Sequence, residues 1–176
     1  MNVRTIFLYA LVFFLPLGTR MLLFRFIPGF HEYETAFLYA TDIFLAAFLA
    51  AFGKRVLIVD LDSQANTTSG MGLLPHRIEK TIYDALIGRC SAEEAIKKTK
   101  LLSVDILPAS PALAGANIEL VDIPNREYKL KEVLEPLRRR YDFILIDSAP
   151  SVGLLTINAL TLSGKVIIPV QCEYYA

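Results

Sequence analysis

The sequence predicts an α/β fold, a mostly parallel sheet with helices on both faces. Four short apolar runs, rich in β-branched residues, alternate with segments of helical character. This alternation is typical of parallel strands joined by helical crossovers. Two of the runs end in aspartate, at the strand ends where open α/β sheets bind their ligands. The alternation begins near residue 53, after a hydrophobic segment of different composition.

The overall composition gives no strong indication of a partner. The chain has 176 residues, enough for one α/β domain, and 18 basic residues balance 18 acidic ones. A net charge of zero produces no strong field toward nucleic acid. Cys90 and Cys172 lie far apart in the sequence and form no metal-type spacing. We therefore expect two free thiols in a reducing compartment.

The first 52 residues are dominated by Phe, Leu, Ala and Tyr and carry few charges. The apolar run Ile6 to Leu17 is shorter than the ~20 residues that a helix needs to cross a bilayer. The run Ala36 to Phe52 is longer but contains Asp42, which costs roughly 2.5–3.5 kcal/mol at a bilayer centre. Neither run is sufficient alone as a membrane span.

Three interpretations of this N-terminal segment stay open. The first is a hairpin of two short or tilted spans, with Arg4 and Lys54–Arg55 on the cytoplasmic side. The second is a buried helix and strand in an enlarged core. The third is a sequence that does not fold. Arg4 and the run after it also suit a signal peptide, but no small-x-small cleavage site follows, so we expect no cleavage.

Each expected strand is an apolar run of four to six residues, typical of a strand buried in a parallel sheet. The runs are 55–60 (RVLIVD), 104–108 (VDILP), 142–147 (DFILID) and 165–170 (KVIIPV).

The helical segments between the strands carry recognisable signals. Ser91 and Glu94 form a capping box and predict a helix start. One apolar stripe at helical spacing predicts a second helix; it contains Leu130, Val133, Leu134 and Leu137. We expect Pro136 to kink that helix, and the arginines at 138–140 to stabilise its C-terminal end.

The aspartates at the strand ends are the candidate chemical groups. Asp60 and Asp62 follow one apolar run, and Asp147 follows another. An aspartate after four apolar strand residues is the Walker B arrangement, which holds Mg²⁺ directly or through water. The alternative is an aspartate that caps the following turn, because turn-rich segments follow both strands. The residues alone leave these two interpretations equal.

Four longer strings resemble the ParA/Soj family of partition ATPases, a deviant-Walker branch of the P-loop NTPases. They are GKRVLIVDLDSQANTTSGMGL, LAGANIELVD, YDFILIDSAPSVGLLTINAL and VIIPVQCEYYA, and the resemblance extends from Leu45 to Ala176. It implies a P-loop NTPase fold, Rossmann-like, that binds ATP and Mg²⁺ and functions in chromosome or plasmid segregation. It also implies an ATP-dependent homodimer, non-specific DNA binding, a ParB-type partner and a cytoplasmic location.

The resemblance assigns roles to individual residues. Asp62 matches the catalytic aspartate of the nucleotide site, which positions the attacking water. Asp147 matches the Walker B aspartate that serves Mg²⁺, and 148–153 matches the loop that senses the γ-phosphate. Two small departures lie nearby, where Ser63 and Ala149 replace prolines usual in the family.

The family's phosphate loop is missing from this sequence. Counted back from Leu45 without gaps, its place falls on 33–41, YETAFLYAT, which contains neither glycine nor lysine. Glycines let successive backbone N–H groups close on phosphate oxygens, and the lysine reaches the β- and γ-phosphates. Phe37 and Leu38 stand where the family has glycine and lysine. We therefore expect weak ATP binding or none.

These observations predict a hydrophobic segment at 1–44, unrelated to the family, and a partial ParA-like domain at 45–176. The run 21–27 (MLLFRFI) is the candidate for the family's central strand, and the family continues beyond Ala176. Three hypotheses remain: a working partition ATPase, a non-catalytic ParA-like remnant, and a fusion or truncated gene product. In the last of these, residues 6–52 contact a membrane.

Overall fold

The computed structural model describes residues 33–149, 151 and 153–167, with side chains from residue 42 onward. The chain divides into two units, Met1–Thr35 and Ala36–Ala176. The sheet and all contacts given below belong to the second unit. The expected apolar run 6–17 and the expected strand 21–27 lie outside the described residues.

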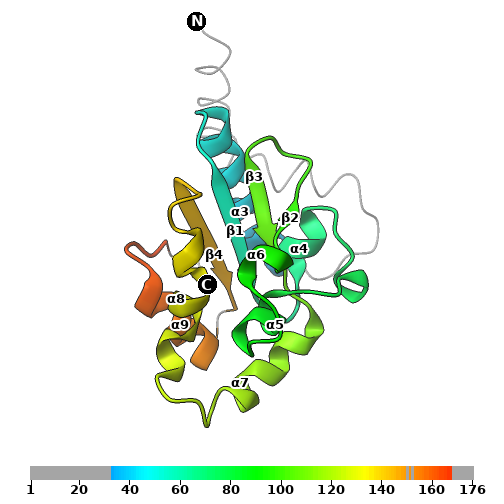
Figure 1. Cartoon of the computed structure of the whole chain (residues 1–176). Coiled ribbons are helices and arrows are strands. Elements are labelled where there is room, and N and C mark those ends of the chain that lie inside the picture. Colours follow the sequence, from blue (N-terminus) through cyan, green and yellow to red (C-terminus); the bar gives the residue numbers. More distant parts are fainter. Residues whose placement is uncertain (1–32, 150, 152, 168–176) are drawn as a thin grey trace, which may run out of the picture. The chain divides into compact units, whose positions relative to one another are not determined.

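The sheet has the order β2-β3-β1-β4 among the described strands (Figure 1). Their bounds are β1 Val56–Leu61, β2 Lys97–Lys98, β3 Val104–Leu107 and β4 Phe143–Ser148. β1 pairs in parallel with both β3 and β4, whereas the short β2 pairs antiparallel with β3. The strands expected at 55–60, 104–108 and 142–147 are confirmed. The two-residue β2 was not predicted, because KK carries no strand pattern.

The helices are short except for the first and the last. The α-helices are α3 Tyr33–Ala51, α4 Asn66–Gly70, α5 Ile82–Leu86, α6 Ala92–Ala95, α7 Ala116–Glu119, α8 Lys129–Leu134 and α9 Leu154–Leu162. The 3₁₀ turns are η1 Pro75–Arg77, η2 Pro111–Gly115, η3 Arg126–Tyr128 and η4 Glu135–Leu137. The capping box of Ser91 and Glu94 is confirmed at the start of α6. Pro136 has the expected effect, since α8 ends at Leu134 and a 3₁₀ turn continues it.

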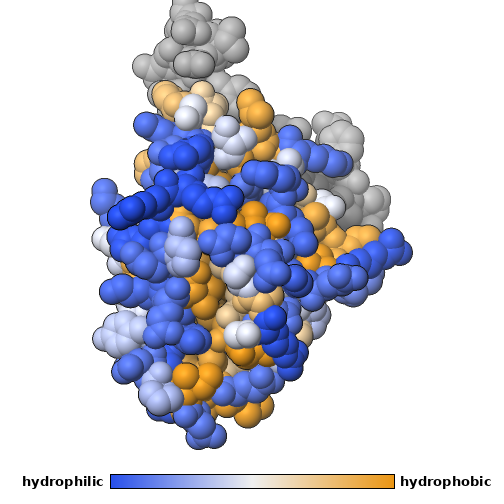
Figure 2. All heavy atoms as spheres, viewed as in Figure 1, coloured by the Kyte–Doolittle hydropathy of each residue, from blue (hydrophilic) through white to orange (hydrophobic). Residues whose placement is uncertain are grey.

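The alternating side chains of β1 divide the core between the two faces of the sheet. Leu57, Val59 and Leu61 enter the larger cluster, which also holds buried residues of α5, α8 and α9. Val56 and Ile58 enter the smaller cluster, which contains Ala46 of α3. Helices therefore cover both faces, as predicted. Figure 2 shows hydrophilic side chains over most of one face of the molecule.

The strand expected at 165–170 is not formed where it is described. Lys165 to Ile167 adopt no regular structure, and 168–170 lie outside the described residues. The side chain of Ile167 is 69% exposed. Among the described strands β4 lies at the edge of the sheet, and residues 165–167 do not pair with it.

Helix α3 runs without interruption across the expected domain boundary between Phe44 and Leu45. Its later part packs on the sheet, as the resemblance implies, because Ala46 is fully buried against β1 and β3. Within the described part of the chain, no helix combines the length and hydrophobicity needed to cross a membrane.

Asn158 of α9 joins helices of the larger core through side-chain hydrogen bonds. Its side chain is fully buried. The amide oxygen accepts the backbone N–H of Leu130 at 2.9 Å, and the amide nitrogen donates to the carbonyl oxygens of Arg126 and Leu154 at 2.8 and 2.9 Å. One side chain thus joins α9 to the start of α8 and to η3.

We expect Asn158→Ala to lower the free energy of unfolding by about 2–4 kcal/mol, because it leaves a buried N–H and carbonyl groups without partners. Urea unfolding followed by circular dichroism measures this change. Ser163→Ala, which removes a hydroxyl bonded within α9 itself, is the control and should change the value by less than about 0.5 kcal/mol. A loss below about 1 kcal/mol for Asn158→Ala would contradict the joining role.

Candidate functional site

The strand-end aspartates come together at the carboxyl edge of the sheet. Asp60 and Asp147 lie directly opposite each other in the parallel pair β1–β4. Asp62 follows β1 by one residue. The sequence-predicted residues Asp62 and Asp147 therefore belong to one local group, as expected for adjacent parallel strands.

Asp60 is fully buried and is held by α4. Its Oδ2 accepts the backbone N–H of Thr68 at 2.8 Å and the Thr68 hydroxyl at 2.6 Å, and its Oδ1 accepts the N–H of Asp62 at 3.2 Å. The Thr68 hydroxyl oxygen in turn accepts the N–H of Ala109, just after β3, at 2.9 Å. Burial raises the pKa of Asp60 to about 6, although the hydrogen bonds from Thr68 oppose this shift.

Asp62 and Asp147 each accept a hydrogen bond from the segment that follows β1. Oδ1 of Asp62 accepts the N–H of Gln64 at 2.9 Å, the geometry of an aspartate that caps a turn. Oδ2 of Asp147 accepts the hydroxyl of Thr67 at 2.6 Å. Each threonine of α4 thus donates a hydrogen bond to a different aspartate near a strand end. This use of Thr67 and Thr68 was not predicted, although the hydroxyl-rich string NTTSG directly after the acids was a signal.

Asp42 of α3 is a further acid in this group. Its partly buried side chain lies beside Asp147, and the two carboxyl groups interact. Burial raises the pKa of Asp42 to about 7, and the charges of Asp147 and Asp60 add to the shift. Burial also raises the pKa of Asp147, against the effect of the Thr67 hydroxyl. Below about pH 7, Asp42 therefore holds a proton and can act as a donor toward Asp147.

From the sequence alone, Asp42 was only a charge in an apolar run. An acid in an apolar helix can also indicate a contact with a distant residue, because a buried acid requires a polar partner. The partner, Asp147, is 105 residues away in the sequence. Sequence spacing alone does not show this contact.

The place of the family's phosphate loop is helical. Residues 33–41, where the resemblance puts the loop, form the first part of α3. In an α-helix the backbone N–H groups beyond the first turn bond to carbonyl oxygens four residues earlier. From Phe37 onward they are therefore not available to a phosphate.

ATP and Mg²⁺ are the groups that the resemblance implies, and the residues present do not fit a triphosphate. The residues that the resemblance aligns with the loop are helical, and Asp147 already accepts the hydroxyl of Thr67. In the ranges that the structure describes, no three His, Cys, Asp or Glu side chains are placed to hold a metal ion. Mg²⁺ usually needs phosphates and waters beside one or two carboxylates, and here the phosphate cradle is missing.

Comparison with known proteins identifies the family to which this chain belongs. The AAA domain family matches residues 39–176. The chain is 52% identical to the sporulation initiation inhibitor protein Soj of Bacillus subtilis over 136 residues, 77% of this chain and 54% of that protein. It is 48% identical to the chromosome partitioning protein ParA of Myxococcus xanthus, over 77% of this chain and 48% of that protein. The chain belongs to the ParA/Soj family.

Solved structures of this family and its neighbours share the fold. Cobyrinic acid a,c-diamide synthase from Mycobacterium smegmatis, solved with a bound ATP analogue and magnesium, is 37% identical with a TM-score of 0.76. The alignment covers 78% of this chain and 56% of that one. A plasmid partition protein from Borrelia burgdorferi is 28% identical with a TM-score of 0.66, over 78% and 62% of the two chains. The chain spans about half the length of the ParA and Soj relatives it matches.

The acid group predicts an unusual pH dependence of stability. The pKa of Asp42 is about 7 in the fold against 3.8 ordinarily, so the folded chain binds more protons than the unfolded chain between these values. The free energy of unfolding must then fall as pH rises from about 4 to 7. Asp42→Asn keeps a donor for Asp147 but has no proton to lose. We expect it to raise the free energy of unfolding at pH 8 by about 1–3 kcal/mol.

Urea unfolding at pH 4.5, 6 and 8, with EDTA present, measures this effect. The difference between Asp42→Asn and the unchanged chain should be smallest at pH 4.5. Asp122→Asn is a matched control at an exposed acid in a turn, and its difference should not grow with pH. If Asp42→Asn has a lower free energy of unfolding than the unchanged chain at pH 8, the proton assigned to Asp42 is contradicted.

Proposed function

We propose that residues 45–176 form a ParA-like partition ATPase domain that does not bind or hydrolyse ATP in the manner of its family. Membership of the ParA/Soj family supports the descent from proteins of chromosome or plasmid segregation. One observation supports the second part of the proposal: the residues that the resemblance aligns with the phosphate loop begin helix α3, and Asp42 of that helix lies beside Asp147.

The physical argument rests on what a phosphoryl-transfer site must supply. Catalysis of this reaction depends on donors and cations aimed at the phosphates. Here the corresponding side of the site presents Asp42 and Asp147, which repel phosphate when both are ionised. Loss of the loop and its lysine removes several kcal/mol of stabilisation. In the proposal Asp62 and Asp147 keep a structural role, as hydrogen-bond acceptors for Gln64 and Thr67.

The proposal extends to partners and location. The family's homodimer, DNA binding and response to a ParB-type protein all depend on ATP, so we expect them to be lost in this chain. The α/β domain belongs in the cytoplasm, as in the family. Of the expected hydrophobic segment 1–44, the part from Tyr33 belongs to helix α3, which continues into the α/β domain. Membrane contact is therefore proposed only for the part of 6–52 that precedes α3, and it would make the chain a fusion or truncated product that carries a ParA-like remnant.

Titration of the full chain with Mg²⁺-ATP tests the central part. We expect no binding of micromolar affinity and no release of phosphate above background, because the phosphate cradle is absent. Isothermal titration calorimetry and a phosphate-release assay measure the two quantities. The cobyrinic acid a,c-diamide synthase, which was solved with an ATP analogue and magnesium, serves as the positive control.

Asp147→Ala identifies the site responsible for any binding that is observed. Micromolar affinity for Mg²⁺-ATP that disappears in Asp147→Ala would overturn the proposal and restore the working ATPase. Circular dichroism should show that the variant keeps its secondary structure.

A further inference from the structure

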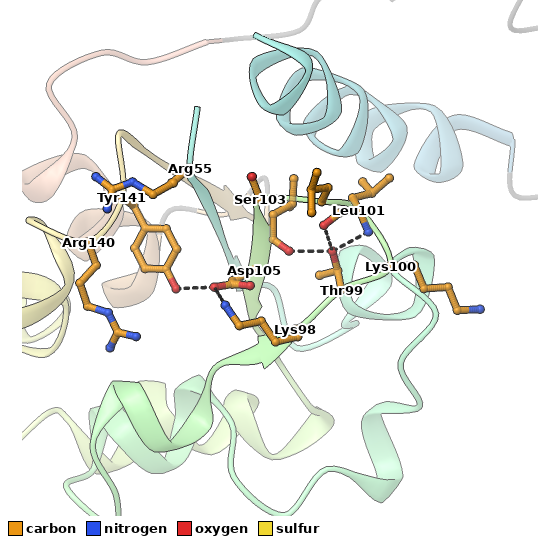
Figure 3. A pocket seen from close by; sticks show the side chains of 11 residues that line it. Arg55, Lys98, Thr99, Lys100, Leu101, Ser103, Asp105, Arg140 and Tyr141 are labelled. Carbon is orange, nitrogen blue, oxygen red and sulfur yellow. Dashed lines mark hydrogen bonds and ion pairs between the residues drawn. The ribbon is translucent and has the colours of Figure 1, made fainter. Parts of the chain in front are cut away.

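A pocket with basic walls lies at the amino-terminal edge of the sheet. It has a volume of about 420 Å³, and its walls come from the residues just before β1 and β4, from the start of β3, and from the β2–β3 connection. Figure 3 shows Tyr141 on one side and Lys98 on the other, with Asp105 between them. None of these residues belongs to the group of strand-end acids described above, which consists of Asp42, Asp60, Asp62 and Asp147.

The pocket and the acid group occupy opposite ends of the same parallel strands. Arg55 precedes the first residue of β1, and Asp60 is the fifth residue of that strand. At about 3.3 Å per residue, five residue steps separate the two by roughly 16 Å. Binding at one end does not use the residues of the other.

The charges of the pocket are unbalanced. Its walls include four cationic side chains and a single acidic one, Asp105. Asp105 is nearly buried and is already satisfied, because Lys98 Nζ and the Tyr141 hydroxyl each donate to it at 2.8 Å. Burial and the bond to Asp105 raise the pKa of Tyr141, so its phenol stays protonated and remains a donor.

The remaining cations are only partly compensated. Arg55 pairs with Asp142, which lies outside the pocket, with Nη2 at 3.3 Å from Oδ1. Arg140 and Lys100 form no ion pair with any residue that the structure describes. Arg140 therefore brings to the pocket wall a guanidinium group whose donors suit a planar or tetrahedral oxyanion.

An apolar side chain stands beside these cations. Leu102 is 90% exposed although it belongs to the pocket wall, and Leu101 lies next to it. A leucine so exposed gains stability when a ligand covers it. The pocket thus combines surplus positive charge with a small apolar area.

We propose that this pocket binds a phosphoryl group, carried by an inorganic polyphosphate or by a small phosphorylated metabolite. Arg140 supplies the principal contact, and Arg55 and Lys98 add positive charge at the rim. The site does not depend on the proposed function, because it shares no residue with the carboxyl edge of the sheet. A dissociation constant of about 0.1–1 mM is expected from two or three charge-assisted hydrogen bonds at a partly open site.

Calorimetric titration of the full chain with pyrophosphate, in EDTA and 0.1 M salt, tests the site. Arg140→Gln should weaken binding about five-fold or more, since it removes the guanidinium and its charge but keeps a polar side chain. Arg139→Gln is the matched control: it changes the net charge equally at an exposed neighbour outside the pocket wall, and it should leave the affinity unchanged. No binding at 10 mM pyrophosphate, or equal weakening in both variants, would overturn the proposal.

A second titration, with AMP, distinguishes the two carriers. Tighter binding of AMP than of pyrophosphate, reduced by Leu102→Ser, supports a phosphorylated metabolite. Tighter binding of pyrophosphate supports an inorganic anion.

Asp147→Ala separates this site from the proposed function. Pyrophosphate binding should persist in Asp147→Ala. Its loss there would overturn the assignment to the basic pocket.

Discussion

Asp60 lies fully buried near the end of the central strand β1. A carboxyl group buried in this way must be hydrogen-bonded. Thr68 satisfies it twice, through the backbone N–H and the hydroxyl, and also accepts the N–H of Ala109. These bonds fix α4 against the ends of β1 and β3. Because α4 is fixed there, Thr67 lies within reach of Asp147 on β4. The carboxyl edge of the sheet depends on this single buried acid.

Crowding of negative charge follows from the same arrangement. Asp42, Asp60 and Asp147 have raised pKa values because burial removes water, and neighbouring carboxylates add repulsion. In a site that binds nucleotide, cations and backbone N–H groups would compensate such charge. Here Asp42 holds a proton below about pH 7, which reduces the charge. An acid edge stabilised by a proton and by two threonines forms a stable fold but offers little to a triphosphate.

The sequence predicted the sheet and its acids well, because β-branched runs and strand-end aspartates are local signals. Three strands, the capping box at Ser91 and the effect of Pro136 are confirmed. The contact of Asp42 with Asp147 was beyond prediction, since it joins distant parts of the chain. The strand expected at 165–170 was wrong over 165–167, because an apolar run predicts a strand but not whether it pairs with the sheet. The basic pocket was also missed, since its cations come from three separate segments.

Hydrogen–deuterium exchange over residues 37–51, with and without Mg²⁺-ATP, tests most directly whether helix α3 has replaced the phosphate loop. If α3 is the stable helix described here, its amides exchange slowly and at the same rate in both conditions, because they bond within the helix. Fast exchange at 37–41 without nucleotide, followed by protection on addition of Mg²⁺-ATP, would contradict this account. That result would show a loop that closes on phosphate.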